Sequence, residues 1–518
     1  MRPGSRSLFW IILFILALIA GFLVSYATSL YGIGLSQDSV VYMAAAQNMA
    51  AGNGITSFNG TPVTLWPPLY PGIVALIGLL TGSDVVVVAR YLNIILAILI
   101  VLLTGIYARQ LRISDIPALG AAAITAWSFP IVATRVMAWS EPLFIVFVVL
   151  SLMALTRFIT HHTVYSLLFF TIAASLAAVT RYIGIVIIPI GFIVILVFSK
   201  ARRLNRLIIA SGVSLAATIP LLAVFVRNWV VSGSIMGPRH PPTITLFANT
   251  VETARVIAGW FLPSNLADNG FIVLAGVLFM QLLLVAAFLE HRRTRDPQQS
   301  ALLLYVPILL FIVFYIVFLL ISTTTTNLNL VNDRYLIPVF IPLMLLIFGS
   351  LSIILDEAQV RLSKAAVAVA FTLLTFLLLA WPLRVTSASA LNWHNNGEGF
   401  NSAVWDRNET LKYLKENPSL FSNKVIYSNY PHAIFAHFRL ASESVPYHYY
   451  TGTTNVLWDL DALAGKWPSG DALVVWFDWG DWQTHLYRPE ELAPISQLAI
   501  LETTADGTIW HALPLSAQ

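Results

Sequence analysis

The segment "LFWIILFILALIAGFLVSYATSLYGIGLSQD" (residues 8–38) runs from an unbroken apolar stretch into an aspartate. A membrane-spanning helix needs about 20 mostly apolar residues, so residues 8–30 predict one crossing, with Asp38 just beyond it. The length of the apolar core and the further apolar segments behind it favour an uncleaved anchor over a cleaved signal peptide. The segment therefore predicts a membrane protein with an acid beside its first crossing.

The composition of the whole chain agrees with a membrane protein. Of its 518 residues, 58% are hydrophobic and 10% are charged, whereas soluble domains carry about 25% charged residues. Cysteine is absent, which excludes disulfides, thiolate metal sites and cysteine nucleophiles. The sequence has no P-loop, GxGxxG or GxSxG motif, so a nucleotide-driven pump or a serine hydrolase finds no support, and we expect no nucleic acid partner.

Apolar segments predict an all-α polytopic membrane domain of about 11–13 transmembrane helices, of which about eleven are clear candidates. The candidates lie at residues 8–30, 86–108, 116–134, 140–157, 164–181, 184–199, 207–226, 271–290, 301–321, 335–354 and 364–383. Lys and Arg cluster in alternate loops, which predicts a cytoplasmic N-terminus and an extracytoplasmic C-terminal region. The alternation requires "WPPLYPGIVALIGLLTG" (66–82) to be a juxtamembrane or re-entrant helix, and its prolines suit that.

The region after about residue 390 has a different character. Acidic residues outnumber basic ones there, and short β-like runs alternate with turns: "KVIYSN", "DALVVWFDW" and "LAILETTADGTIWHAL", the last with an Asp506-Gly507 hairpin signal. We predict a small extracytoplasmic α/β domain at 390–518, with a helix near 404–416. Residues 1–389 then form the transmembrane domain, and its first outer loop, 31–85, carries juxtamembrane helices. Tryptophans of the tail can form its core, anchor it at the membrane or stack on sugars, and the first two are favoured.

Ionisable residues near the predicted outer ends of the spans are candidates for a shared functional surface, because charge at such depth must be hydrated, paired or functional. They are Asp38, Arg135, Glu141, Arg181, Arg227, Asp333 and Arg334.

Asp38 has two interpretations. It begins the small-residue segment "QDSVVYMAAAQNMAAGNG" and shares a helical face with Tyr42 at i, i+4, so it is placed to act as a general base. It can equally be a hydrated helix N-cap.

Glu141, in "WSEPLF", suits a helix start, where a carboxylate is favoured without any chemistry. Arg181-Tyr182 and Arg334-Tyr335 repeat an Arg-Tyr pair at a helix boundary. Each arginine can bind phosphate through its planar fork, or merely snorkel to the interface.

Metal binding has little support from motifs. The histidines are scattered and none has HExxH spacing. Asp38 and Glu141 are oxygen donors of the kind that Mg or Mn accepts, so a divalent ion between them is an open hypothesis.

The motifs, taken in order, resemble the GT-C class of membrane glycosyltransferases. They are "QDSVVYMAAAQNMAAGNG", "WPPLYP", "WSEPLF", "TRYIG" and "NDRYLIP", followed by a tail with "GEGFNSAVW" and "IYSNYP". The class includes dolichyl-phosphate-mannose-protein mannosyltransferases and lipid A aminoarabinose transferases, and the chain is most similar to bacterial relatives of these.

The resemblance implies a multi-pass protein of a bacterial or archaeal-type plasma membrane. It implies an inverting glycosyltransferase that moves a hexose or pentose from a polyprenyl-phosphate sugar to a glycan, lipid or protein hydroxyl at the outer face. Asp38 would be the base and Glu141 a second catalytic acid. Arg334, Tyr335, Arg181 and Tyr182, with Tyr42 and Arg227, would bind the lipid phosphate and sugar. Gln37 and Trp66 stand where many members carry an acid and a charged residue or histidine, so metal dependence stays open.

Two other functions compete. A transporter or flippase of a lipid-linked glycan should carry polar residues near the middle of the bilayer, whereas here they gather at one face. The second competing function is that of a catalytically inactive scaffold whose outer domain only binds.

Overall fold

The computed structural model of the protein describes residues 3–237, 242, 244–270, 276, 281, 301–326, 328, 330–358, 363–449, 456–478 and 485–515. The predicted span 271–290 lies outside them except for two positions. The chain forms two compact units. The first comprises Met1–Ser29, Thr64–Val74 and Val87–His394, and the second Leu30–Val63, Ala75–Val86 and Asn395–Gln518. Most of the first outer loop, 31–85, thus belongs to the same unit as the tail. The predicted domain bounds, 1–389 and 390–518, stay a prediction.

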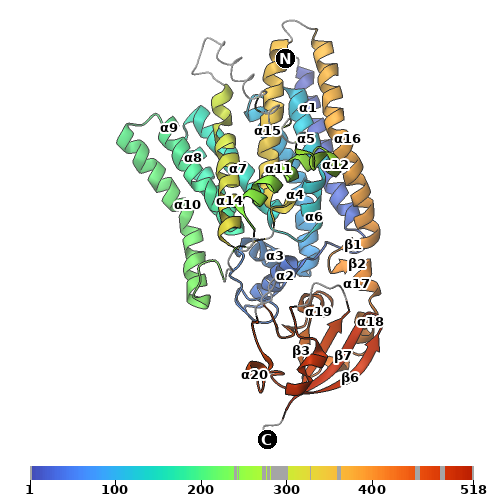
Figure 1. The fold of residues 1–518 in the computed structure, drawn as a ribbon. Coiled ribbons are helices and arrows are strands. Elements are labelled where there is room, and N and C mark those ends of the chain that lie inside the picture. The colour runs from blue at the N-terminus through green and yellow to red at the C-terminus, as the bar shows by residue number, and fades with distance from the viewer. Residues whose placement is uncertain are drawn as a thin grey trace. The chain divides into compact units, whose positions relative to one another are not determined.

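The first unit is a bundle of long helices (Figure 1). Its helices are α1 (Pro3–Ala27), α4 (Val85–Gln110), α5 (Asp115–Trp127), α6 (Phe129–Val136), α7 (Glu141–His161), α8 (Val164–Thr180), η1 (Tyr182–Val186), α9 (Ile187–Phe198), α10 (Arg203–Ser232), α11 (Leu246–Gly259), α12 (Ser264–Ala267), η3 (Ala301–Tyr305), α14 (Val306–Thr325), α15 (Asp333–Ala358) and α16 (Lys364–Asn396).

Six helices in the described residues are long and apolar enough to cross a membrane: Ser7–Ala27, Val85–Gln110, Glu141–His161, Arg203–Ser232, Leu302–Thr325 and Asp333–Ile354. The protein is therefore an integral multi-pass membrane protein. Helix α8 and the η1–α9 segment occupy two further predicted spans and are shorter apolar helices.

The predicted span 116–134 differs from a single straight helix. It consists of α5 and α6, which meet at an angle of 46°. Ser128 between them is extended, and Pro130 follows in the first turn of α6. Because proline lacks an N–H and favours a helix start, it begins a new helix here instead of continuing the old one.

Helix α3 (Leu69–Thr81) contributes to both units. Its 13 residues span roughly 20 Å, less than the ~30 Å of hydrocarbon that a crossing requires. This agrees with the prediction that residues 66–82 do not cross the membrane.

The second unit combines helices with a mixed sheet. The helices are α2 (Gln37–Ala50), α17 (Ala403–Arg407), α18 (Glu409–Glu416), η4 (Pro418–Phe421), α19 (Pro431–Phe438), α20 (Leu460–Leu463) and η6 (Pro489–Ile495). The sheet has the order β4-β3-β5-β7-β6, with β3 (Val425–Ser428), β4 (Glu443–Ser444), β5 (Ala472–Phe477), β6 (Ser496–Thr504) and β7 (Gly507–Pro514), and β1 (Gly397–Glu398) pairs with β2 (Asn401–Ser402).

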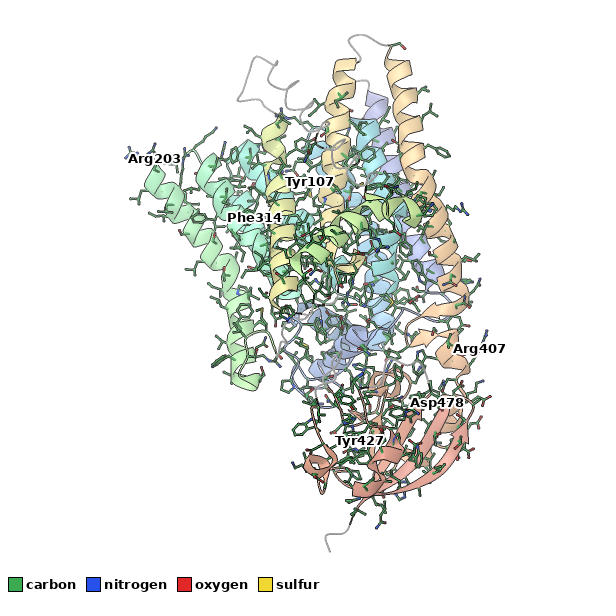
Figure 2. The ribbon with its side chains drawn as sticks, viewed as in Figure 1. Tyr107, Arg203, Phe314, Arg407, Tyr427 and Asp478 are labelled. Atoms are coloured by element: carbon green, nitrogen blue, oxygen red, sulfur yellow. The ribbon has the colours of Figure 1, made fainter. Side chains whose placement is uncertain are left out.

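The predicted α/β character of the tail is confirmed. Strand β3 runs parallel to β4 and β5, whereas β7 is antiparallel to β5 and β6. The three predicted β-like runs contain β3, β5 and the β6–β7 hairpin. The turn of this hairpin is Ala505-Asp506, one residue before the predicted Asp506-Gly507, because Gly507 already pairs with Thr504 as the first residue of β7. Tyr427 (Figure 2), Trp467 and Trp510 lie in the core of this sheet, so these two tryptophans serve packing.

Candidate active site

Glu141 is the first residue of α7, with Ser140 as N-cap and Pro142 behind it. The predicted helix start is thus confirmed. The side chain has no exposed surface, although it lies at the end of an apolar helix. The positive end of the helix dipole favours a carboxylate there, but full burial of a charge requires cationic partners as well.

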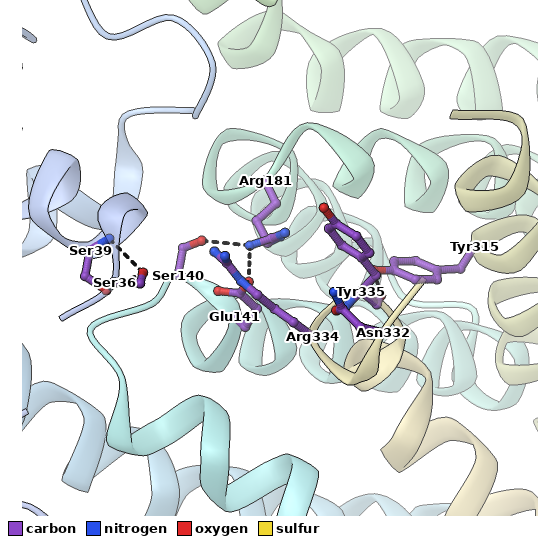
Figure 3. A network of polar contacts seen from close by, with 9 residues as sticks. All are labelled: Ser36, Ser39, Ser140, Glu141, Arg181, Tyr315, Asn332, Arg334 and Tyr335. Carbon is purple, nitrogen blue, oxygen red and sulfur yellow. Dashed lines mark hydrogen bonds and ion pairs between the residues drawn. The ribbon is translucent and has the colours of Figure 1, made fainter. Parts of the chain in front are cut away.

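Two arginines from distant segments supply those partners. Arg181, the C-cap residue of α8, places its Nη1 2.6 Å from Oε1 of Glu141. Arg334, in the first turn of α15, donates from Nε to the same oxygen. Figure 3 shows both guanidinium groups pointing at this carboxylate. The structure therefore brings together three of the residues singled out in the sequence.

The surroundings hold the two guanidinium groups in place. Arg181 Nη1 also donates to Ser140 Oγ at 3.2 Å, and the Arg334 guanidinium carbon lies 4.3 Å from the centroid of the Trp139 ring. The side chains of Arg181 and Arg334 are 18% and 21% exposed. One carboxylate between two guanidinium groups leaves a formal charge of about +1, at a site that solvent still reaches.

The start of α15 is fixed by contacts that the sequence analysis missed. Tyr315 of α14 donates its hydroxyl to the Tyr335 carbonyl at 2.8 Å, and the Tyr335 N–H lies 3.3 Å from Asn332 Oδ1. These bonds hold the backbone on which Arg334 sits. A tyrosine inside an apolar span was the available signal, because a buried hydroxyl needs a partner.

Tyr182 and Arg227 belong to a neighbouring network centred on Asn228, which was also missed. Asn228 Nδ2 donates to the Tyr182 hydroxyl at 2.8 Å and to the Ile235 carbonyl at 2.9 Å. The Tyr182 hydroxyl donates to the Thr64 carbonyl at 2.8 Å. Arg227 Nη1 donates to Asn228 Oδ1 at 3.0 Å. The network ties the chain just before "WPPLYP" to α10 and to the segment that carries Arg181.

Arg135 and Asp333 do not join the Glu141 cluster. The expectation that Arg135 lies at a surface is wrong: its side chain has no exposed surface. None of its guanidinium nitrogens has a hydrogen-bond partner within the described residues. Helix α6 packs against α1 and α15, which carries Arg135 into the bundle. The Asp333 carboxylate accepts from Trp260 Nε1 at 2.8 Å.

Asp38 lies in the second unit, in the first turn of α2. The interpretation of Asp38 as N-cap is wrong, because Ser36 is the N-cap and its hydroxyl accepts from the Ser39 N–H at 3.3 Å. Asp38 is partly exposed. Tyr42, one turn later, is 1% exposed and packs inside the unit, so its ring does not present a binding surface.

A divalent ion on Glu141 does not fit this geometry. Its Oε1 is held by two cationic groups, and the carboxylate is fully buried. Among the described residues there is no group of three or more His, Asp or Glu side chains that could hold a metal ion.

Part of the chain matches a known family, and its fold is similar to solved structures. Residues 60–231 match the family model described as dolichyl-phosphate-mannose-protein mannosyltransferase. The fold is similar to the crystal structure of ArnT from Cupriavidus metallidurans bound to undecaprenyl phosphate, at 15% identity and a TM-score of 0.56 over 99% of this chain and 98% of that one. The chain therefore shares the fold of ArnT, and a third of it matches a mannosyltransferase family model.

A second GT-C structure agrees in fold. Archaeal oligosaccharyltransferase AglB from Archaeoglobus fulgidus, in complex with an inhibitory peptide and a dolichol-phosphate, is 13% identical, with a TM-score of 0.51 over 85% of this chain and 65% of that one. No curated protein gives a significant sequence match. The predicted fold class, a helical membrane region with an α/β tail, is thereby confirmed.

Proposed function

We propose that this protein is a GT-C glycosyltransferase, which moves a sugar from a polyprenyl-phosphate-linked donor to an acceptor hydroxyl at the outer face of the membrane, with inversion at the anomeric carbon. The observation that carries the proposal is the convergence of Arg181 and Arg334 on the buried carboxylate of Glu141. The lipid phosphates in the titles of the ArnT and AglB structures support a donor of this kind.

The charge of the cluster suits this reaction. The phosphodiester of such a donor carries one negative charge, and the phosphate gains a second when its bond to the anomeric carbon breaks. Prepositioned guanidinium groups stabilise the charge that develops in the transition state, where electrostatic stabilisation contributes most. Arg181 and Arg334 take this role, and Glu141 positions them. The residues next to the two arginines are themselves held in place, because Tyr182 donates its hydroxyl to the Thr64 carbonyl and the Tyr335 carbonyl accepts from Tyr315.

Asp38 completes the reaction as general base. The acceptor oxygen bonds to the anomeric carbon, the bond from that carbon to the phosphate oxygen breaks, and the hydroxyl proton passes to the Asp38 carboxylate. Direct displacement of this kind inverts the anomeric centre. The distribution of Lys and Arg between alternate loops supports an outer-face location.

The test uses the full-length protein in liposomes with a fluorescent polyprenyl-phosphate sugar. We expect transfer of the sugar to an added acceptor, loss of turnover in Asp38→Asn, and a raised donor KM in Arg334→Ala. Arg255→Gln, which alters an exposed pair with Glu252 and Asp268, is the control and should be unaffected. Movement of intact donor across the bilayer without any transfer would favour a flippase instead and contradict the proposal.

A further inference from the structure

The second unit contains a pocket of 310 Å³ beside the start of α2. Its lining includes the rings of Phe400, Trp405 and Tyr430, together with Leu35, Ser36 and Gln37. No lining residue carries a charge. Ligand pockets typically occupy about 300–1,000 Å³, so this one suits a single small ring.

The pocket wall is joined to α2 by backbone pairing between distant parts of the chain. The Phe400 N–H donates to the Leu35 carbonyl at 2.8 Å, and the Leu35 N–H to the Glu398 carbonyl at 3.4 Å. Gly399 between them has a φ of +60°, and a Cβ there would lie 2.1 Å from the Leu35 carbonyl oxygen. Only glycine fits this approach, so the first turn of α2 and the pocket wall are held as one piece.

The aromatic rings that line the pocket pack against one another and form one rigid side of it. The Trp405 ring lies 5.4 Å from both Phe400 and Tyr430, between ring centroids. It also contacts Phe477 of β5 edge-on at 5.3 Å. Aromatic surface combined with a hydroxyl and an amide, and without charge, is the chemistry that recognises a neutral ring with an apolar face and several hydroxyls.

The location of the pocket connects it with the proposed reaction. Gln37 lines the pocket and Asp38 follows it directly; adjacent Cα atoms lie about 3.8 Å apart. A sugar ring in the pocket thus contacts the residue that directly precedes the one assigned as base. We propose that this pocket binds a saccharide ring of the acceptor, so that the acceptor hydroxyl belongs to a glycan and not to a protein side chain. This inference rests on the proposed function.

The test separates acceptor from donor recognition in the full-length protein. Gln37→Ala changes an exposed side chain, and Trp405→Leu removes the central ring. We expect each to lower kcat/KM for an oligosaccharide acceptor about three- to tenfold, as loss of an aromatic contact or hydrogen bond implies. The donor KM and the slow transfer of sugar from donor to water should stay unchanged. Trp458→Phe, at a half-exposed tryptophan outside the pocket, is the matched control.

Three results would overturn the inference: unchanged acceptor kinetics in both variants, an equal change in donor KM, or a peptide serving better than the oligosaccharide as acceptor. If Trp405→Leu fails to fold, Gln37→Ala alone decides. The failure of the proposed function looks different, because then no lipid-linked sugar is consumed by the unmodified protein. In that case saturation-transfer NMR with methyl mannoside still tests the pocket: binding that Gln37→Ala weakens supports a sugar site, and no binding refutes it.

Discussion

Replacement of Glu141 by glutamine distinguishes a residue that positions two arginines from one that takes part in the chemistry. The amide keeps the shape of the carboxylate and one acceptor oxygen, but it removes the charge. In the native protein this charge is fully buried and shared by Arg181 and Arg334. The variant therefore weakens two charge-assisted contacts while it leaves the packing of α7 intact.

The size of the effect follows from those two contacts. A charge-assisted hydrogen bond is about twice as strong as a neutral one, so each arginine loses roughly 1–1.5 kcal/mol of orienting interaction. Both arginines are about one-fifth exposed, so water replaces part of the loss. We expect a total of at most about 2–3 kcal/mol, which lowers kcat/KM for the donor by at most roughly 30- to 160-fold.

The assay is a cycle of variants measured with the fluorescent lipid donor. Glu141→Gln is compared in the native background and in Arg181→Gln/Arg334→Gln. If Glu141 acts only through the arginines, it has no further effect on donor kinetics in the double variant. The thermal stability of that background should even rise, since a buried carboxylate without its cations is replaced by a neutral group.

Two results would refute the positioning role of Glu141. One is a further tenfold fall in turnover when Glu141→Gln is added to the double variant, because this would show a direct contribution. The other is donor kinetics in Glu141→Gln that match those of the Arg255→Gln control.

Three further substitutions or conditions test the remaining assignments. Asp38→Asn should lower turnover by about 10²–10⁴-fold, the usual range for a general base, with normal membrane insertion measured by protease protection. Gly399→Ala should destabilise the second unit by at least about 2 kcal/mol in thermal unfolding, whereas Gly60→Ala, also at positive φ but with open space around it, should cost less. Burial lowers the pKa of His432 and of His437 to about 4, from 6.5. Between these values the unfolded state binds more protons than the folded state, so stability should be full above pH 6.5 and fall as the pH drops towards 4. Thermal unfolding from pH 7.5 to 4.5 measures this, and a flat profile would contradict the burial of these histidines.

The membrane helices and the α/β tail could be predicted from the sequence because their signals are local. An apolar run of about 20 residues or an Asp-Gly turn between β-like runs acts over a short stretch of chain. The break at Ser128 was missed, since Pro130 in an apolar segment is also compatible with a kinked span. The burial of Arg135 was missed because it depends on how α6 packs, and an arginine near a predicted helix end suggests a surface.

The Glu141 cluster was predictable in part. Its three members stand out as charges at the boundaries of apolar helices, and boundaries on one side of a membrane can meet. Their mutual pairing was not predicted, because no local sequence pattern around Arg181 or Arg334 indicates a contact with Glu141. The backbone pairing of Leu35 with Gly399 could likewise not be predicted, because it joins segments that lie far apart in the sequence.

The proposed roles divide between the two compact units. Groups assigned to the donor phosphate, Arg181, Arg334 and Glu141, all belong to the first unit, whereas the base Asp38 and the aromatic pocket belong to the second. Substitutions within the cluster of Glu141, Arg181 and Arg334 share contacts and should be strongly non-additive. Substitutions taken from different units share none of the contacts described above, so their effects on donor and acceptor parameters should multiply. A large coupling between Glu141→Gln and Gln37→Ala would therefore contradict the assignment of separate donor and acceptor groups.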